Sequence, residues 1–284
     1  MRGLIKYTNK LQEFLLKMMP YFKGSWLIYA SLFRLLPTSL RYIKLEDPDI
    51  ILDLSDPPQF SIVKMRNGIV EPALTKFIKQ SLRQGDIFID VGANWGYFTC
   101  LGSKIVGDTG LVIAIEPIRD TFLKLLNTID RNKLFNVICF NVALSDVAGK
   151  LVDFEKPWYR QSTSAFIVLR KENGRIKTLT GDWIVEKINN PEKIKIVKID
   201  VEGAEFLVLR GFKNFLSSFN PFIVVEVGDF YKRFGYTLND VLTFMKYLGY
   251  EPTYILDDYG SKRVFIYSEN MIPRSGEIVF RKLK

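Results

Sequence analysis

The sequence predicts an α/β fold built on a mostly parallel sheet. From residue 87 onward, apolar segments of strand length alternate with segments of helical periodicity. The strand segments are apolar almost without interruption, which is typical of strands that helices cover on both faces. Two late strands follow one another with no helix between them and predict a closing antiparallel hairpin. A chain of 284 residues is long enough for one such domain and an extension.

We expect seven strands in this sheet, and the helices between them follow from the same pattern. The predicted strands are 87–91, 111–115, 137–142, 194–199, 221–227, 253–256 and 263–267. The predicted helices are 97–106, one that ends near residue 132, 204–216 and 238–248. Two strand-like segments, 50–54 and 60–65, precede the sheet with a turn at 56–58 between them. The polar stretch around 150–190 interrupts the alternation and predicts an insertion over the site.

The first 44 residues differ from the remainder, so we divide the chain into a helical extension, 1–44, and a domain, 45–284. Apolar residues recur at helical spacing from Leu4 to Phe22, opposite basic residues. Eight basic residues and one acidic residue give the extension a net charge of +7. The apolar run from Trp26 to Leu36 is too short for a membrane span. We therefore expect a cytoplasmic protein. Three roles remain open for its extension: packing as a lid on the domain or as a homo-oligomer contact, docking on an anionic inner membrane surface, and contact with nucleic acid.

The composition excludes several kinds of chemistry. The chain has no histidine, which rules out a Ser-His-Asp triad, a Cys-His dyad and any histidine metal site. The two cysteines, Cys100 and Cys139, lie in apolar segments and are predicted to be reduced, buried thiols. No arrangement of acidic residues requires a metal, so we expect none. Proton transfer must then use Asp, Glu, Lys, Tyr or water.

The segment Gly85–Gly96 predicts a strand, a glycine-rich turn and the start of a helix. In an open parallel sheet, ligands bind beyond the carboxyl ends of the strands, where this turn lies. The predicted ligand-binding residues are Asp90, Gly92, Ala93, Asn94 and Gly96. The glycines allow a tight turn and close approach of the backbone, and Asp90 suits a cationic group. The dinucleotide fingerprint G-x-G-x-x-G fails here, because Asn94 and Tyr97 occupy its second and third glycine positions. A tight turn without a ligand is the alternative.

The next two strands end in further candidate contacts for the same ligand. Glu116 ends the second strand, 26 residues after Asp90, and its carboxylate can accept hydrogen bonds from both hydroxyls of a ribose. Val142 and Ala143 end the third strand and are predicted to flank an adenine ring, with Asp146 near its amino group. Ordinary strand packing is the alternative for this third segment.

Acidic residues also end the fourth strand and lie in the fifth. Asp200 and Glu202 directly follow the fourth strand and are the candidates for chemistry on an acceptor. Glu205 is predicted to cap or face the next helix. Glu226 lies in an apolar strand, where an unpaired carboxylate is costly. It is therefore either hydrogen-bonded structure or part of the site.

These motifs together resemble the FkbM family of methyltransferases. The runs D-V-G-A-N-x-G, I-E-P, K-I-D-V-E-G-A-E and P-x-x-V-x-E occur in this order between Gly85 and Glu226, half of the chain. The resemblance implies a Rossmann-like class I methyltransferase fold, S-adenosylmethionine as the cofactor, and O-methylation, often of sugar or polyketide hydroxyls. Two segments depart from the family: 179–183 matches its T-L-D stretch only loosely, and the basic extension lies outside its core.

The resemblance also implies roles for the motif residues. The loop with Asp90, Gly92, Asn94 and Gly96 holds the methionine side of the cofactor. Glu116 binds the ribose, while Asp200 with Glu202 faces the acceptor.

Three classes of function are compatible with these features. A hydroxyl methyltransferase acting on a small, glycan or lipid-linked acceptor needs a carboxylate to take the hydroxyl proton; Asp200 and Glu202 are the candidates, with Tyr159 and Lys198 as less favoured ones. The basic ends raise the alternative of a nucleic-acid methyltransferase, but Gln59 follows Asp56-Pro57-Pro58 where an aromatic residue would be needed, so nucleic acid is unlikely as the partner. A non-catalytic cofactor-binding module is the third class.

Overall fold

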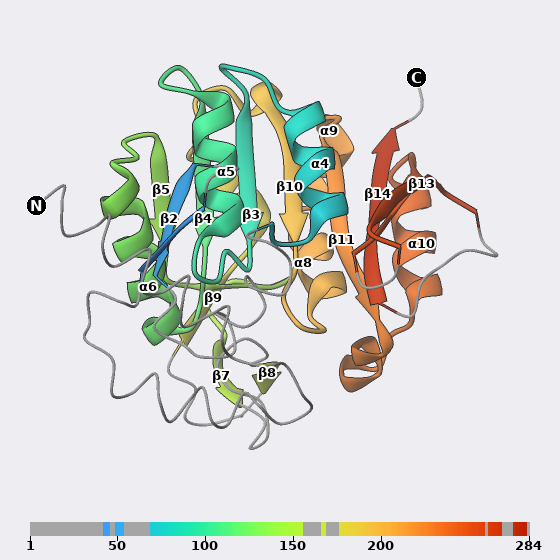
Figure 1. Cartoon of the computed structure of the whole chain (residues 1–284). Helices are drawn as coiled ribbons and strands as arrows, with labels where there is room; N and C mark the ends of the chain where they lie inside the picture. Colours follow the sequence, from blue (N-terminus) through green and yellow to red (C-terminus); the bar gives the residue numbers. More distant parts are fainter. Residues whose placement is uncertain are drawn as a thin grey trace, which may run out of the picture.

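The computed structural model describes residues 42–45, 49–53, 69–155, 166–168, 176–258, 261–268 and 275–282. Within these ranges the chain forms an eight-stranded sheet with helices on both faces (Figure 1). The predicted helix at Leu4–Phe22, the strand at 60–65, the turn at 56–58 and Tyr159 lie outside the described residues. The predicted α/β class and Rossmann-like fold are confirmed.

The order of strands across the sheet is β13-β12-β14-β11-β10-β3-β4-β5. In that order they are Arg263–Ile266, Tyr250–Asp257, Ser275–Lys282, Phe222–Gly228, Ile194–Ile199, Ile87–Val91, Leu111–Ile115 and Val137–Phe140. The last five are mutually parallel, while β14 is antiparallel to both β11 and β12. The pair β12–β13 is the predicted antiparallel hairpin. The carboxyl ends of the five parallel strands therefore meet along one edge, and the site lies there.

The remaining elements connect or cover this sheet. The helices are α4 (Pro72–Ser81), α5 (Tyr97–Val106), α6 (Arg119–Asn132), α7 (Gly181–Val185), α8 (Glu205–Gly211), α9 (Lys213–Ser218) and α10 (Leu238–Tyr247), with 3₁₀ turns η2 (Pro191–Lys193) and η3 (Asp229–Phe234). A hairpin of β1 (Tyr42–Leu45) and β2 (Ile50–Asp53) precedes them. The small strands β6 (Ala143–Leu144), β7 (Leu151–Glu155), β8 (Phe166–Val168) and β9 (Ile176–Leu179) form a second sheet in the region where we predicted an insertion.

The sheet has one strand more than the seven we predicted, because β14 inserts between β11 and β12. The apolar stretch of β14 is only Ile278–Phe280, which is fully buried. Charged residues flank it on both sides, so the sequence pattern does not indicate a strand there. The predicted helix 204–216 is also divided, into α8 and α9, at Phe212. Asp182 accepts hydrogen bonds from the first-turn amides of α9, and this cap stabilises the second helix as a separate unit.

Alternating residues of each strand face two different cores. Phe88 of β3 packs with α4 and α5 in front of the sheet in Figure 1, whereas Ile89 packs with α8, α9 and α10 behind it. By the same alternation, Asp90 and Lys198 face the side of α4 and α5, in register with each other. Glu226 and Glu277 face that side too, again in register. The front core thus gives way to a row of charged side chains at the edge where the site lies.

None of the helices in the described ranges combines the length and the hydropathy that a membrane span requires.

Candidate active site

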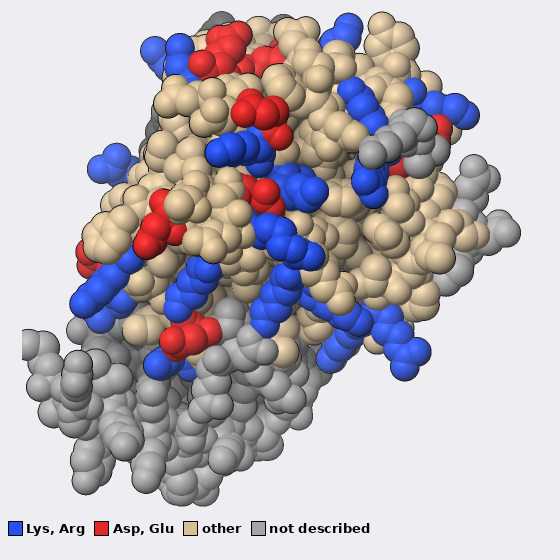
Figure 2. Space-filling model, turned by 90° about the horizontal axis from the view of Figure 1, so that it is seen from above, with Lys and Arg blue, Asp and Glu red and all other residues tan. Residues whose placement is uncertain are grey.

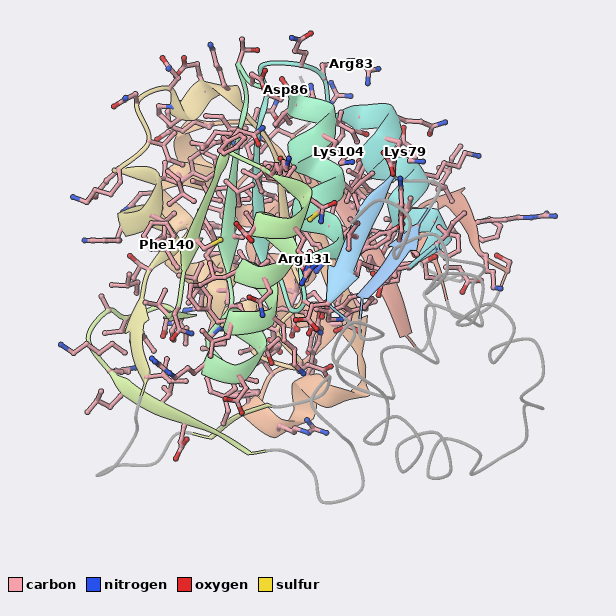
Figure 3. The ribbon with its side chains drawn as sticks, turned by 60° about the vertical axis from the view of Figure 1, so that its left-hand side comes forward. Lys79, Arg83, Asp86, Lys104, Arg131 and Phe140 are labelled. Atoms are coloured by element: carbon pink, nitrogen blue, oxygen red, sulfur yellow. The ribbon has the colours of Figure 1, made fainter. Side chains whose placement is uncertain are left out.

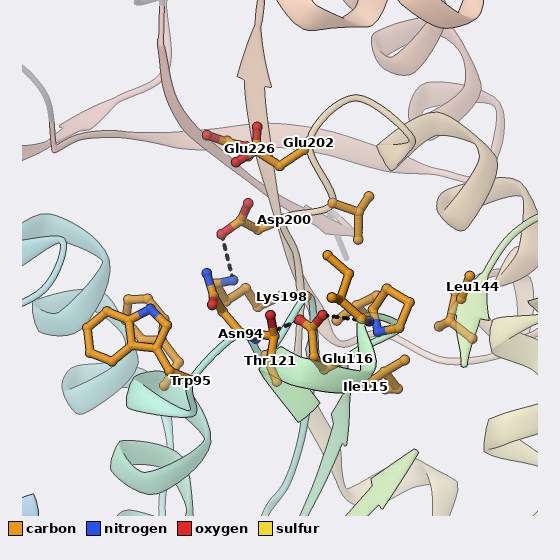
Figure 4. Close-up of a pocket in the computed structure, with 18 of the residues that line it drawn as sticks. Asn94, Trp95, Ile115, Glu116, Thr121, Leu144, Lys198, Asp200, Glu202 and Glu226 are labelled. Carbon is orange, nitrogen blue, oxygen red and sulfur yellow. Dashed lines mark hydrogen bonds and ion pairs between the residues drawn. The ribbon is translucent and has the colours of Figure 1, made fainter. Parts of the chain in front are cut away.

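A pocket of about 250 Å³ opens at the carboxyl ends of β3, β4, β10 and β11 (Figure 4). Its lining falls into two groups of side chains. The first group, at β4 and the start of α6 and the small sheet, comprises Ile115, Glu116, Pro117, Ile118, Thr121, Val142, Ala143, Leu144 and Phe154. The second, at β10, β11 and the start of α4 and α5, comprises Val70, Glu71, Trp95, Tyr97, Phe98, Lys198, Asp200, Val201, Glu202 and Glu226. The turn 91–94 lines the pocket between them.

The turn after β3 is held against the turn after β10. Gly92 has a φ of 80°, and a Cβ atom at this position would lie 1.8 Å from the carbonyl oxygen of Asp200. Only glycine fits so close an approach. Gly96, with a φ of 93°, is the N-cap of α5 and does not line the pocket. The first predicted glycine therefore joins the two turns of the site, and the second starts a helix.

Glu116 is fixed at the end of β4 by two backbone amides. Its Oε2 accepts a hydrogen bond from the amide of Asn94 at 3.0 Å, and its Oε1 accepts one from the amide of Ile118 at 2.9 Å. Burial raises the pKa of Glu116 to about 7, although both amide bonds oppose the shift. Each oxygen keeps a lone pair for a further donor, so the side chain retains the capacity to accept two hydroxyls.

Asp90 lies behind the pocket wall and is not on its lining. Its side chain is fully buried, its Oδ2 accepts a hydrogen bond from the hydroxyl of Thr99 at 2.7 Å, and its Oδ1 lies 3.7 Å from Nζ of Lys198. The predicted direct contact of Asp90 with a cofactor is not what this geometry favours, because Asp90 is off the pocket lining while its neighbour Lys198 is on it. Asp90 supports Lys198 instead.

Lys198 is a buried ammonium between two carboxylates. Its Nζ lies 3.0 Å from Oδ2 of Asp200, on the side opposite Asp90, and 5.3 Å from the ring centroid of Phe98. Burial alone would lower the pKa of Lys198, but Asp200 and Asp90 raise it above its usual value. The lysine therefore stays charged and holds Asp200 at the pocket.

The two predicted catalytic residues both line the pocket. The Asp200 side chain is 32% exposed, and Glu202, with a φ of 57°, lies on the turn between β10 and α8. In Figure 4 they lie with Glu226 at the end of the pocket away from Ile115 and Leu144. Glu205 is buried in the first turn of α8, but its Oε1 accepts hydrogen bonds from the amides of Val201 and Gly203, so it holds the turn before the helix and does not cap the helix.

Glu226 belongs to the site as well as to the sheet. It lines the pocket, yet its Oε2 is enclosed and has no hydrogen-bond partner among the described residues. Burial raises its pKa well above the usual range, and Asp200 raises it further. Glu277 of β14 is opposite Glu226 in register and is 4% exposed. Its Oε2 is also enclosed, with no hydrogen-bond partner among the described residues.

Of the three residues predicted to surround adenine, two line the pocket. Val142 and Ala143 line the pocket, together with Leu144. Asp146 does not, because its carboxylate is turned toward Arg210 at 3.2 Å and Lys150 at 4.0 Å. Sequence reasoning also missed Glu71, which precedes α4 with a φ of 44°. The Glu71-Pro72 pair at a helix start was its only local signal.

Comparison with known proteins identifies the family of the chain. A model of the methyltransferase FkbM domain matches residues 90–252. The hexuronic acid methyltransferase AglP of Haloferax volcanii is 34% identical over 166 residues, which are 58% of this chain and 66% of that protein. The match thus spans just under two thirds of the relative's length.

Solved structures with a similar fold include two methyltransferases. A methyltransferase FkbM from Methylobacillus flagellatus has a TM-score of 0.42 at 14% identity, over 79% of this chain and 54% of that one. An S-adenosylmethionine-dependent O-methyltransferase from Thermotoga maritima has a TM-score of 0.43 at 14% identity, over 76% of this chain and 67% of that one.

The fold and the motifs around the pocket define an S-adenosylmethionine-dependent methyltransferase domain. The chain belongs to the FkbM family of methyltransferases, whose domain model covers more than half of it.

Proposed function

We propose that this protein transfers the methyl group of S-adenosylmethionine to a hydroxyl oxygen of a sugar or glycan, free or lipid-linked. The observation that carries the proposal is the position of Asp200 and Glu202, which line the pocket at the end of β10, next to the glycine turn. The sugar acceptor is supported by AglP, a relative that acts on a hexuronic acid.

The residues present suit the cofactor. Glu116 has lone pairs free for the two ribose hydroxyls, and Val142 with Ala143 offers apolar contacts for adenine. The backbone of Gly92, Ala93 and Asn94 is left for the methionine end. When bound, the cofactor supplies an electrophilic methyl group on a sulfonium cation, and the acidic end of the pocket complements that charge.

The chain contributes a base and its orientation. A neutral hydroxyl is a weak nucleophile, and a carboxylate that accepts its proton as the carbon–oxygen bond forms accelerates transfer by about 10²–10⁴-fold. The ion pair with Lys198 orients Asp200 at the pocket, whereas Glu202 lies on the turn that follows it. Alignment of the reacting atoms by the pocket walls supplies a further part of the rate.

A mass-spectrometric screen for methyl transfer to lipid-linked and free glycans tests the proposal. We expect methylated product with the unaltered protein, and turnover lower by about 10²–10⁴-fold in Asp200→Asn or Glu202→Gln. Each substitution keeps the shape of the side chain and removes a base, so affinity for S-adenosylhomocysteine should change little. Normal turnover at saturation together with weakened cofactor binding would instead make both residues binding groups. Methylation of nucleic acid and of no glycan would refute the acceptor class.

A further inference from the structure

The acceptor end of the pocket carries more carboxylates than cations. Among the described residues that line the whole pocket, the acidic ones are Glu71, Glu116, Asp200, Glu202 and Glu226. Lys198 is the one lysine or arginine in that lining, and Asp90 and Asp200 already share its charge. A site with this balance attracts a positive ligand and opposes the ionisation of its own acids.

Glu226 is the member of this group that lies within the sheet, next to Asp200. Its Oε2 is enclosed and receives no hydrogen bond from the described residues. The charged and titratable groups that face it come from every neighbouring element. They are Lys198, Asp200 and Glu202 of β10 and its turn, Glu205 of α8, Glu277 of β14, Glu71 before α4 and Tyr231 of η3. All except Lys198 are acidic groups, and Tyr231 donates its hydroxyl hydrogen to the main-chain oxygen of Glu226.

Carboxylates this close together do not all ionise near neutral pH, because each raises the pKa of the others. Lys198 pairs with Asp200 at 3.0 Å and lies 3.7 Å from Asp90, so its charge is directed to these two residues. The proton then falls to Glu226, whose pKa burial already raises.

The cofactor changes this balance. If Glu116 holds the ribose at one end of the pocket, as proposed, the sulfonium group would face the carboxylates at the other end (Figure 4). A positive charge within about 4–6 Å lowers the pKa of a carboxyl by ~1–3 units. A sulfonium near the carboxylates would therefore favour loss of the proton that they share.

We propose that Glu226 holds a proton in the empty pocket and that the positively charged methyl donor expels this proton to solvent. The carboxylates at the acceptor end then reach full charge when a methyl group is in place for transfer. After transfer the sulfonium charge is gone, and Glu226 takes a proton again before the neutral product leaves. The proposal rests on the cofactor position given under the proposed function, but it holds for any acceptor.

Calorimetry in buffers of different ionisation enthalpy tests this, with S-adenosylmethionine and S-adenosylhomocysteine as the probes. The two differ in charge only at the sulfonium, so the difference in protons released isolates its effect. We expect S-adenosylmethionine to release more protons near neutral pH, by up to about one. Glu226→Gln should abolish this difference, and Glu192→Gln, an exposed residue of η2, should retain it.

The contrary outcomes are distinct. Equal proton release by the two probes, or a difference that persists in Glu226→Gln, would overturn the proposal while leaving the methyltransferase function intact. A difference lost in Glu277→Gln and retained in Glu226→Gln would overturn it by placing the proton on β14. If neither probe binds, the proposed function fails as well.

A second measurement needs no variant. In protein labelled with ¹³C at glutamate carboxyl carbons, one signal should titrate above the usual glutamate range, and its midpoint should fall with S-adenosylmethionine and not with S-adenosylhomocysteine. If every signal titrates in the usual range, the proposal is wrong.

Discussion

At the scale of single residues, the protonation state of Glu116 should determine cofactor affinity. Its pKa is raised to about 7, mainly by burial. Under the proposed function the ionised side chain accepts two ribose hydroxyls, and protonation would turn one acceptor into a donor. Because binding then requires the group to lose its proton, affinity for S-adenosylhomocysteine should fall as pH falls through about 7, by up to about tenfold per pH unit. Calorimetry across this range measures the slope.

Glu116→Gln is the matched variant for this prediction. It keeps one acceptor oxygen and cannot titrate, so binding should be weaker at high pH and nearly independent of pH. Glu192→Gln should leave the wild-type slope unchanged, because this residue is exposed at the opposite end of β10. A wild-type affinity that is flat through this pH range would contradict the assignment of Glu116 to the ribose.

Asp90 and Glu116 show what the sequence predicts at this scale and what it does not. Both are acidic residues at the ends of neighbouring apolar strands, and the pattern treats them alike. Glu116 follows the last residue of β4 and reaches the pocket, whereas Asp90 precedes the last residue of β3 and faces the helices. Asp90 is level with Ala114 across the two strands, so Glu116 lies two positions, roughly 7 Å, further toward the carboxyl edge of the sheet. A boundary predicted from sequence is too coarse to separate these two outcomes.

At the scale of elements, the contact between the turns after β3 and β10 forms the middle of the site. Gly92→Ala would force a Cβ atom against the carbonyl oxygen of Asp200, which lies 1.8 Å from its ideal position. Because the obstacle is backbone, the turns must separate. We expect S-adenosylhomocysteine affinity to fall by at least about tenfold. The loss of folding stability, measured by thermal unfolding, should exceed the ~1–2 kcal/mol that a left-handed alanine alone costs.

Gly149→Ala separates these two effects. Gly149 has a φ of 83°, close to the 80° of Gly92, but a Cβ atom there would meet no atom within 4 Å. It should therefore show the strain without the separation of the turns, with cofactor affinity unchanged. Equal losses in both variants, in melting temperature and in affinity, would show that the close approach at Gly92 has no role in the site.

The elements themselves were predictable where burial leaves a pattern. The helix at 97–106 has the bounds we predicted, and the five parallel strands appear as apolar runs. The strand β14 was missed because its apolar stretch is short and is preceded by Glu277, an acidic residue that is nevertheless buried. Glu277 lies beside Glu226 of β11 in the row of charged side chains at this edge of the sheet. Glu226 belongs to the same row, and from the sequence it could be either a structural residue or part of the site. Long-range placement, which local pattern does not encode, decides both cases.

At the scale of the whole molecule, the two ends of the parallel sheet differ. The pocket lies at the carboxyl ends, while Arg83 and Asp86, which precede β3, lie at the opposite end (Figure 3). Figure 2 shows that opposite end, with many Lys and Arg side chains among fewer Asp and Glu. We do not expect the acceptor to bind at this surface, because the pocket is at the other end of the sheet. Orientation at a membrane must then depend on how the extension joins the domain.

The extension joins on the side of α6. Strand β1 begins at Tyr42, opposite Asp53 in register, and the amide of Asp53 donates a hydrogen bond to the hydroxyl of Thr128. Thr121, which lines the pocket, is on the same helix, about 10 Å away along the axis at 1.5 Å per residue. The described domain thus receives the extension on the helix whose first turn lines the pocket. Because β1 crosses the predicted boundary at residue 44, a truncation should end at residue 41.

We propose that residues 1–41 dock on an anionic membrane surface and carry the pocket to a lipid-linked acceptor. Basic residues near such a surface contribute about 1 kcal/mol each, and the apolar stripe from Leu4 to Phe22 adds burial. The intact protein should float with anionic vesicles at physiological salt and not with neutral ones. Binding should weaken as salt screens the charges.

The truncated protein distinguishes docking from the other roles of this segment. If the segment is an anchor, protein lacking residues 1–41 should melt at the same temperature, bind S-adenosylhomocysteine equally well and no longer float. If it is a lid over the pocket, cofactor affinity or melting temperature should fall, because contacts with the domain are lost. If it joins two copies of the chain, the mass in solution should change instead. Failure of the intact protein to float with anionic vesicles would end the membrane proposal, since that charge and that apolar stripe are its whole basis.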